Sequence, residues 1–502
     1  MKRIITGIAA FALAISVFAG STISVCAKDK SYTYNYDYWG DVQDSPDFYM
    51  VQDSFTSGAL GLDVPMKSPQ GLFAKDNLLY IVDTGNNRII EMEKNAEDGS
   101  FKVLRYITEF KGGDLEVKTF ATPTDVSVDD DGNFYIADKD NSRILKLDND
   151  LNYIMQFTIP VDPSLDEKTN FQPNKLAVDT AGRVYCIATG INKGLIKYES
   201  NGDFASFVGA TPVSYNFFDY LKKKFATQAQ REKMISFVPT EYENIFMDHE
   251  GFVYACIASV KEEDLKAGTV HAVRKLNLLG DDILVRNGEF PVYGDIYMGT
   301  GGGISGPSRF ADVTCMDNDV YVCLDRNRGR LFGYDDQGNL VFAFGGNGNR
   351  DGYFRQPSAI VNMGRDLYVL DSLDCSITTF GTTEFGDVVF DAMEQFDRGE
   401  YDASEASWIH AKNLNGNYDL AYIGIGRALL RQEKYKEAME YFEVKYDADN
   451  YSKAYKQYRK VWIEENIGLV VAALIVIVVV PLAIGKIRRI KREIDMADIF
   501  RI

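Results

Sequence analysis

Six segments of this sequence share one pattern, and one position within it carries most of the residues that could do chemistry. The segments are aligned on a Pro-x-x-aliphatic start, seen best in SPQGLF, TPTDVS and QPSAIV. The equivalent position then holds Gly71, Asp125, Lys175, Asn244, Asp312 and Ala359. The residues just before it are Gln70, Thr124, Asn174, Glu243, Ala311 and Ser358.

If the six segments surround one axis, these side chains face a common channel. Asp125, Asn244 and Asp312 offer oxygen ligands, which suit a hard cation such as Ca²⁺. Lys175 opposes a cation, and the alternative is that it pairs with Asp125 or Asp312 and neutralises the channel. We favour neutralisation, so no cofactor is expected and calcium stays the alternative. The candidate ligand-binding residues are Asp125, Lys175, Asn244 and Asp312, with Asn174 and Glu243 beside them.

A tyrosine recurs in the strand-like run that follows each of these positions. The runs are LLYIVD, NFYIAD, RVYCIA, FVYACI, DVYVCL and DLYVLD, with tyrosines 80, 135, 185, 254, 321 and 368. Recurrence at a period of several tens of residues is typical of repeat architectures. Short alternating runs bounded by Gly, Asn and Asp predict antiparallel hairpins, and six such sheets set radially bury each other's faces.

The units resemble NHL repeats, and residues 342–372 (FAFGGNGNRDGYFRQPSAIVNMGRDLYVLDS) resemble them most closely. The resemblance implies a mainly β fold, a six-bladed NHL-type β-propeller that we place at residues 28–388. Related propellers include binding scaffolds, lyases and lactonases, so the fold alone does not assign function. The acidic channel residues are similar in kind to the metal site of gluconolactonase-type propellers, although that family's motifs do not match residue by residue.

Both ends of the chain indicate a membrane protein. Residues 1–27 combine an early Lys-Arg pair, an apolar stretch and Val25-Cys26-Ala27, the pattern of a secretory signal peptide. Residues 467–485 (IGLVVAALIVIVVVPLAIG) are free of charge and long enough to cross a bilayer. The basic residues that follow place the tail, residues 486–502, in the cytoplasm and everything before residue 466 outside.

Composition excludes some partners. The formal charge of −19 argues against nucleic acid, because phosphate binding needs a basic face. Of the five cysteines beyond the signal peptide, we expect most to be small core residues, with Cys315 and Cys323 close enough to pair. Histidine-based catalysis and zinc are not supported, since His249 and His271 lack a suitably spaced partner.

Residues 389–466 show helical periodicity. Tyr401 lies 34 residues before Tyr435, which is the tetratricopeptide period. The second unit fits that pattern at Tyr422, Gly426, Ala428, Tyr435, Ala438 and Phe442, whereas the first has Ser404 where a small alanine is usual. The resemblance is to two tetratricopeptide repeats and a third helix from about 451 to 462 that runs into the membrane span. A rigid stalk and a peptide-binding module are both open roles.

Two further segments could serve structure or binding. Residues 212–238 predict a helical insertion, either an apolar cap over a blade seam or a binding loop. The aromatic segment SYTYNYDYWGD, residues 31–41, could close the ring or stack on a sugar.

The sequence thus predicts a single-pass membrane protein whose propeller and helical segment bind a protein or carbohydrate at the cell envelope, alongside a transport complex or alone. The alternative is a calcium-dependent, gluconolactonase-like hydrolase that uses Asp125, Asn244 and Asp312. We favour binding over catalysis.

Overall fold

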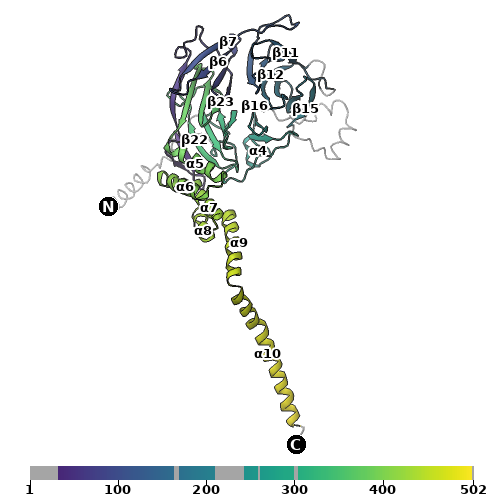
Figure 1. Ribbon diagram of the computed structural model, residues 1–502, viewed down its shortest axis with the longest axis vertical. Coiled ribbons are helices and arrows are strands. Elements are labelled where there is room, and N and C mark those ends of the chain that lie inside the picture. The colour runs from purple at the N-terminus through teal and green to yellow at the C-terminus, as the bar shows by residue number, and fades with distance from the viewer. Residues whose placement is uncertain are drawn as a thin grey trace, which may run out of the picture. The chain divides into compact units, whose positions relative to one another are not determined.

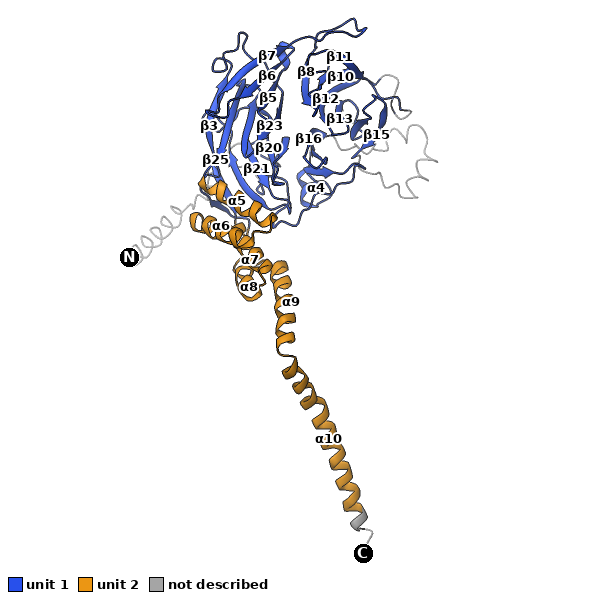
Figure 2. Cartoon of the chain, viewed as in Figure 1, with its two compact units in different colours: residues 1–36, 40–383 blue, residues 37–39, 384–502 orange. Residues whose placement is uncertain are grey.

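The computed structural model describes residues 32–162, 165, 169–209, 242–257, 260–298 and 304–499. The predicted signal peptide (1–27) and helical insertion (212–238) lie outside the described residues. The chain forms two compact units, one of residues 1–36 and 40–383 and one of residues 37–39 and 384–502 (Figure 2).

The first unit is a six-bladed β-propeller, as the six sequence units predicted (Figure 1). Each blade is an antiparallel sheet. Blade 1 is β4 (Gly71–Lys75), β5 (Leu78–Asp83), β6 (Arg88–Lys94) and β7 (Phe101–Ile107). Blade 2 is β8 (Pro123–Val128), β9 (Phe134–Asp138), β10 (Arg143–Leu147) and β11 (Tyr153–Phe157). Blade 3 is β12 (Gln172–Val178), β13 (Val184–Thr189), β14 (Leu195–Tyr198) and β15 (Phe204–Val208).

The second half of the ring is less regular. Among the described residues, blade 4 has β16 (Tyr242–Met247), β17 (Val253–Ile257) and β18 (Val273–Leu276), and the short helix α4 (Glu262–Lys266) lies in the β17–β18 connection. Blade 5 is β19 (Phe310–Cys315), β20 (Tyr321–Asp325), β21 (Arg330–Tyr334) and β22 (Leu340–Gly345). Blade 6 is β23 (Pro357–Met363), β24 (Asp366–Asp371) and β25 (Ser376–Thr382), completed by β3 (Tyr49–Thr56).

The amino-terminal segment closes the ring. Strand β3 pairs antiparallel with β25, with Tyr49 opposite Thr382 and Thr56 opposite Ser376. The aromatic segment just before it takes another place: β1 (Thr33–Tyr36) pairs with β22 and with β2 (Val42–Asp44), which extends blade 5 to six strands. The closing strand therefore begins a few residues after the segment that the sequence suggested.

The six recurring tyrosines are buried between blades. Each is at most 2% exposed. Tyr80 packs on the blade 2 residue Phe134, with ring centroids 5.6 Å apart, and Tyr254 of blade 4 lies 5.2 Å from Tyr321 of blade 5. Tyr368 of blade 6 is in contact with Phe101 of blade 1 at 5.8 Å. Because each blade is covered on both faces, its middle strands are buried nearly throughout rather than alternately.

Buried aspartates fix the approach to four of the six blades. Asp83 and Asp138, both fully buried, end the second strands of blades 1 and 2. Each binds the arginine five residues later, Arg88 at 2.7 Å and Arg143 at 2.8 Å, and also accepts a backbone N–H from the segment leading into the blade. Asp325 and Asp371 accept the matching backbone N–H groups in blades 5 and 6. The aspartates of the turns seen in the sequence therefore have a structural role, because they hold the segment that leads into the blade.

Cys315 and Cys323, which the sequence left open as a possible pair, do not form a disulfide. Cys186, Cys256, Cys315, Cys323 and Cys375 are all free. In the β19–β20 register, Cys315 lies opposite Tyr321 and Cys323 opposite Val313, so the two side chains are offset along the hairpin. Burial raises the pKa of the Cys315 thiol to about 12, which keeps it protonated and unreactive.

The second unit is helical. Its helices are α5 (Glu384–Asp397), α6 (Tyr401–Leu414), α7 (Asp419–Arg431), α8 (Tyr435–Val444), α9 (Ala448–Glu465) and α10 (Ile467–Ile499). Helix α5 starts at Glu384, before the boundary placed at 389, because Phe385, Val389 and Phe390 supply its buried face. Consecutive helices from α5 to α9 contact one another, and α5 also contacts α7.

Helix α10 contains the apolar run 467–485 and continues beyond it. From Ile467 to Met496 it is long and apolar enough to cross a membrane, and its side chains are exposed rather than packed into the protein. The preceding helix does not run straight into it: α9 ends at Glu465, and Asn466, with φ −108° and ψ 21°, separates the two.

Candidate functional site

The candidate site lies where the innermost strands of the six blades meet. Strands β4, β8, β12, β16, β19 and β23 contact one another in a closed cycle. Five of them, β8, β12, β16, β19 and β23, break register between residues 123 and 125, 173 and 175, 242 and 244, 310 and 312, and 357 and 359. A β-bulge re-aims the residues around it. The bulged residues are Thr124, Asn174, Glu243, Ala311 and Ser358, and the predicted channel position follows directly.

Gly71 holds that position in blade 1 for a steric reason. A Cβ there would lie 2.9 Å from the carbonyl oxygen of Thr124 and 3.0 Å from Val82 Cγ2. Close approach of the neighbouring blade's backbone therefore requires glycine at this point of the ring.

Asp125 and Asp312 each bridge two blades. Asp125 Oδ2 accepts the backbone N–H of Leu176 at 2.9 Å, which joins blades 2 and 3. Asp312 Oδ2 accepts that of Ile360 at 2.8 Å and its Oδ1 that of Val313 at 2.8 Å, which joins blades 5 and 6. Both carboxylates are 6% exposed. They occupy equivalent places half a ring apart and have a structural role.

Lys175 lies near Asp125. Its Nζ is 3.9 Å from Asp125 Oδ1 and donates to the carbonyl oxygen of Gln70 at 3.3 Å. Burial raises the pKa of Asp125, and Lys175 opposes that rise. Burial also raises the pKa of Asp312 to about 7, again against the field of Lys175, while the negative charge of Asp125 adds to the rise. The ring therefore holds a small net charge near neutral pH.

Asn244 supplies a polar group that the protein leaves unused. Its Oδ1 accepts the backbone N–H of Ile245 at 2.8 Å, and the residue is 3% exposed. Within the described part of the chain, its Nδ2 donates to no protein acceptor. Asn244 lines the cavity, so this amide donor is available to a ligand at the ring.

The predicted residues separate into two sets. Asp125, Lys175, Asn244 and Asp312 line one cavity of about 730 Å³. Asn174 and Glu243 occupy bulges and are not part of its lining. Glu243 instead pairs with Arg326 of blade 5 at 2.8 Å.

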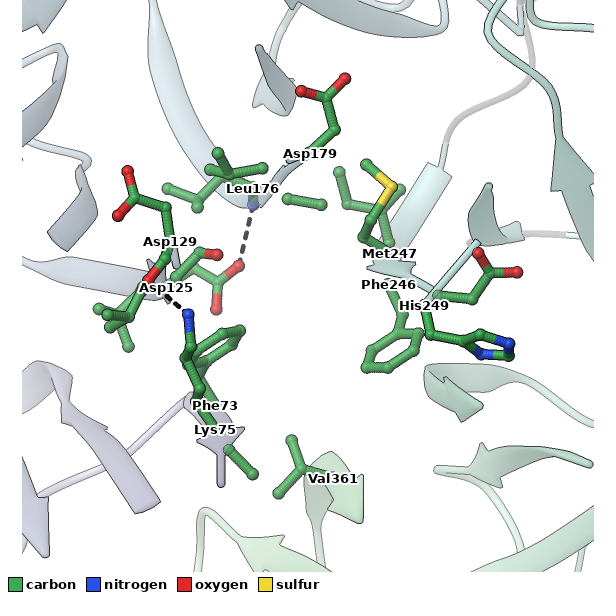
Figure 3. Close-up of a pocket in the computed structure, with 18 of the residues that line it drawn as sticks. Phe73, Lys75, Asp125, Asp129, Leu176, Asp179, Phe246, Met247, His249 and Val361 are labelled. Carbon is green, nitrogen blue, oxygen red and sulfur yellow. Dashed lines mark hydrogen bonds between the residues drawn. The ribbon is translucent and has the colours of Figure 1, made fainter. Parts of the chain in front are cut away.

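The cavity has further levels that the sequence analysis missed. Two residues beyond the ring position come Phe73 and Phe246, and four residues beyond it come Lys75, Asp129, Asp179 and Asp248. Figure 3 shows Phe73 and Phe246 on opposite sides of the open space, with Val361 below them and His249 beside Phe246. Side chains alternate along a strand, so residues two and four positions after the ring position point to the same side as it does. This spacing could have identified these lining residues from the sequence.

Most acids at the outer level are already paired. Lys75 donates to the Asp129 carbonyl oxygen and contacts Asp130 at 2.9 Å. Asp179 binds Arg183 at 2.7 Å, and Asp248 binds Lys275 at 3.0 Å. Asp129 and Asp179 also cap their own hairpins by accepting backbone N–H groups two and four residues later. The acids at the outer level therefore mainly stabilise the hairpin turns to which they belong.

The ring residues do not fit a calcium ion. Calcium takes six to eight oxygen ligands, but both ring carboxylates accept backbone N–H groups and Lys175 brings a positive charge beside one of them. In the ranges that the structure describes, no group of three or more His, Cys, Asp or Glu side chains is placed to hold a metal ion.

Several solved structures resemble this chain at low sequence identity. Similar solved structures include a catalytically inactive virginiamycin B lyase from Staphylococcus aureus with quinupristin, at 12% identity over 64% of this chain and 81% of that chain, with a TM-score of 0.37. A streptogramin B lyase is 9% identical over 67% of this chain and 98% of its own, with a TM-score of 0.38. A protein of unknown function from Bacteroides thetaiotaomicron is 10% identical over 67% and 76%, with a TM-score of 0.39.

At these TM-scores the likenesses carry no inference about activity. No match was found among the curated proteins. Residues 120–147, which span β8 to β10 of blade 2, match the family described as NHL repeat. The first unit is thus a six-bladed propeller with an NHL repeat in its second blade.

Proposed function

We propose that this chain is a membrane-anchored binding protein that presents an NHL-like propeller and a tetratricopeptide-like helical unit outside the membrane, where they engage a protein or carbohydrate. The observation that carries the proposal is helix α10. It exposes an uninterrupted apolar surface over residues 467–485. Exposure of such a surface to water is unfavourable, whereas a lipid bilayer accommodates it.

The flanks of α10 set the orientation in this proposal. Lys486, Arg488, Arg489, Lys491 and Arg492 follow the apolar run, while Glu464 and Glu465 precede it. Basic residues stay on the cytoplasmic side. The propeller then lies outside, which agrees with a signal peptide at residues 1–27, and the tail at 486–502 lies inside.

The helical unit supports a binding role through its repeat geometry. Helices α6 and α8 start at Tyr401 and Tyr435, the period seen in the sequence. Glycines on α7 leave room for large side chains of the two neighbouring helices. Gly424 lies against Trp408 of α6, and Gly426 lies against Phe442 of α8. Ser404 is fully buried, and its hydroxyl donates to the Ala392 carbonyl oxygen at 2.8 Å, which explains a serine at an alanine position.

The alternative hydrolase has less support. It required Asp125, Asn244 and Asp312 to act on a substrate through calcium, and two of these hold neighbouring blades together. We therefore propose no cofactor.

Affinity capture from detergent-solubilised membranes tests the proposed function. The full chain is compared with a chain in which Thr383 is joined directly to Asn466, which removes α5 to α9 at their observed limits. We expect a protein that the full chain retains and the deletion loses, or a protein that both retain through the propeller. Recovery of the same proteins from a tag-only control would overturn the proposal.

A further inference from the structure

We propose that the propeller cavity binds an uncharged ligand rich in hydroxyl groups, of the size of a mono- or disaccharide. The proposal rests on the binding role proposed above and deepens it, since it names a small carbohydrate class and places it in the propeller cavity. The cavity, about 730 Å³, lies within the ~300–1,000 Å³ range of small-molecule sites.

The hydrogen-bonding groups at the ring indicate which kind of ligand fits the cavity. Asn244 lines the cavity, and its Nδ2 donates to no acceptor among the described residues. Lys175 Nζ donates to the Gln70 carbonyl oxygen. Asp125 Oδ1, 3.9 Å from Lys175 Nζ, remains an acceptor. A hydroxyl group both accepts and donates, so one polyol can satisfy the amide, the ammonium and the carboxylate together.

The charges at the ring disfavour a charged ligand there. A carboxylate or phosphate entering the ring would meet Asp125 and Asp312, and Lys175 is their single cationic neighbour in the cavity at that level of the described structure. A cation would meet Lys175 at the ring. At the outer level it would find that Asp179 and Asp248 are already paired. A neutral ligand avoids both penalties.

Aromatic walls suit the apolar faces of a sugar ring. Phe73 of blade 1 and Phe246 of blade 4 are half-buried and lie on opposite sides of the cavity (Figure 3). Val361 adds a third apolar contact. An apolar wall with a few fixed polar groups at one end is the general form of a small-molecule site.

Binding of neutral sugars to the full-length protein in detergent tests this proposal. Isothermal titration is run with glucose, galactose, mannose, N-acetylglucosamine, maltose and sucrose, and with glucuronate and glucosamine as charged counterparts. We expect at least one neutral sugar to bind more tightly than its charged counterpart. No binding by any neutral sugar at millimolar concentration, or preference for a charged one, overturns the proposal.

Two variants locate the binding. Asn244→Asp keeps the acceptor for the Ile245 N–H and removes the Nδ2 donor, and we expect roughly tenfold weaker binding. Asn201→Asp, in an exposed turn of blade 3, makes the same change outside the cavity and leaves affinity unchanged. If Asn244→Asp does not fold, Phe246→Ala with Phe246→Tyr as its conservative partner replaces it, and weakening by alanine alone is expected. Equal affinity for the cavity variant and wild type contradicts the site, whatever the capture experiment shows.

Discussion

The carboxylate of Asp312 in blade 5 accepts a 2.8 Å hydrogen bond from the backbone N–H of Ile360 in blade 6. Asp125 makes the same bond to Leu176 between blades 2 and 3 at 2.9 Å. These two side chains therefore hold innermost strands together at opposite points of the ring. Their acidity at a channel position suggested a metal site, whereas their contacts assign them to the scaffold.

Replacing Asp312 with alanine should destabilise the propeller. The change leaves the buried N–H groups of Ile360 and Val313 without an acceptor, which costs about 1–3 kcal/mol in the free energy of unfolding. Denaturant unfolding of the purified protein measures the loss. Asp131→Ala, in an exposed turn, is the control and should stay within about 0.5 kcal/mol of wild type. Equal stability of the two variants would show that the bridge contributes nothing.

The stability of the propeller should also depend on the protonation of Asp312. Its folded-state pKa of about 7 lies above the ordinary value of 3.8, because burial penalises the charged form. The folded state therefore binds a proton that the unfolded state releases. The stabilisation is complete below pH 3.8 and is lost as the pH rises through about 7, at up to about 1.4 kcal/mol per pH unit.

Unfolding of wild type and Asp312→Asn between pH 5 and pH 8 isolates this contribution. The variant cannot ionise at this position, so its stability should fall less steeply with rising pH than that of wild type. Parallel profiles for the two proteins would rule out a raised pKa at Asp312.

The fold was predictable because its signal is repeated. Six tyrosine-bearing runs and their turns define six blades without long-range information, and the apolar run at 467–485 defines a helix that is long and apolar enough to span a membrane. Ring closure was less accessible, since nothing local to Tyr49–Thr56 shows that it pairs with a strand more than 300 residues away. The pairing of β3 with β25 depends on the closure of the whole ring, which no local pattern in the sequence reveals.

The site was predictable in position but not in role. Alignment of the repeats identified Asp125, Lys175, Asn244 and Asp312, and all four line one cavity. The sequence could not show that backbone N–H groups already occupy the two carboxylates, or that Glu243 turns away to Arg326. Both depend on the bulges, which shift the register by one residue and have no clear sequence mark.

Packing in the helical unit predicts a sharp response at Gly424. A Cβ at this position of α7 would overlap the indole ring of Trp408, and overpacking of this kind costs about 1–3 kcal/mol. Gly424→Ala should therefore lower the unfolding temperature of the helical unit and change the fluorescence of Trp408. Gly416→Ala is the matched control, because a Cβ there meets nothing within 4 Å. Identical behaviour of the two variants would contradict the packing of α6 on α7.

Ring closure by β3 predicts a graded effect of shortening the amino terminus. A chain that starts at Pro46 lacks β1 and β2 but retains β3, and it should fold with reduced stability. A chain that starts at Ser57 lacks the fourth strand of blade 6 and should lose cooperative unfolding. Limited proteolysis and thermal unfolding compare the two, and similar resistance of both chains would show that β3 is dispensable.

Protease protection in intact cells tests the central claim, that the propeller is anchored outside by α10. Cells carry the full chain with a tag after Ile502, and protease is added before and after the membrane is opened. The account predicts that the propeller is digested in intact cells while a tagged fragment containing α10 and the tail survives until the membrane is opened. A propeller that resists digestion until the membrane is opened, or a tag that is lost from intact cells, would contradict it.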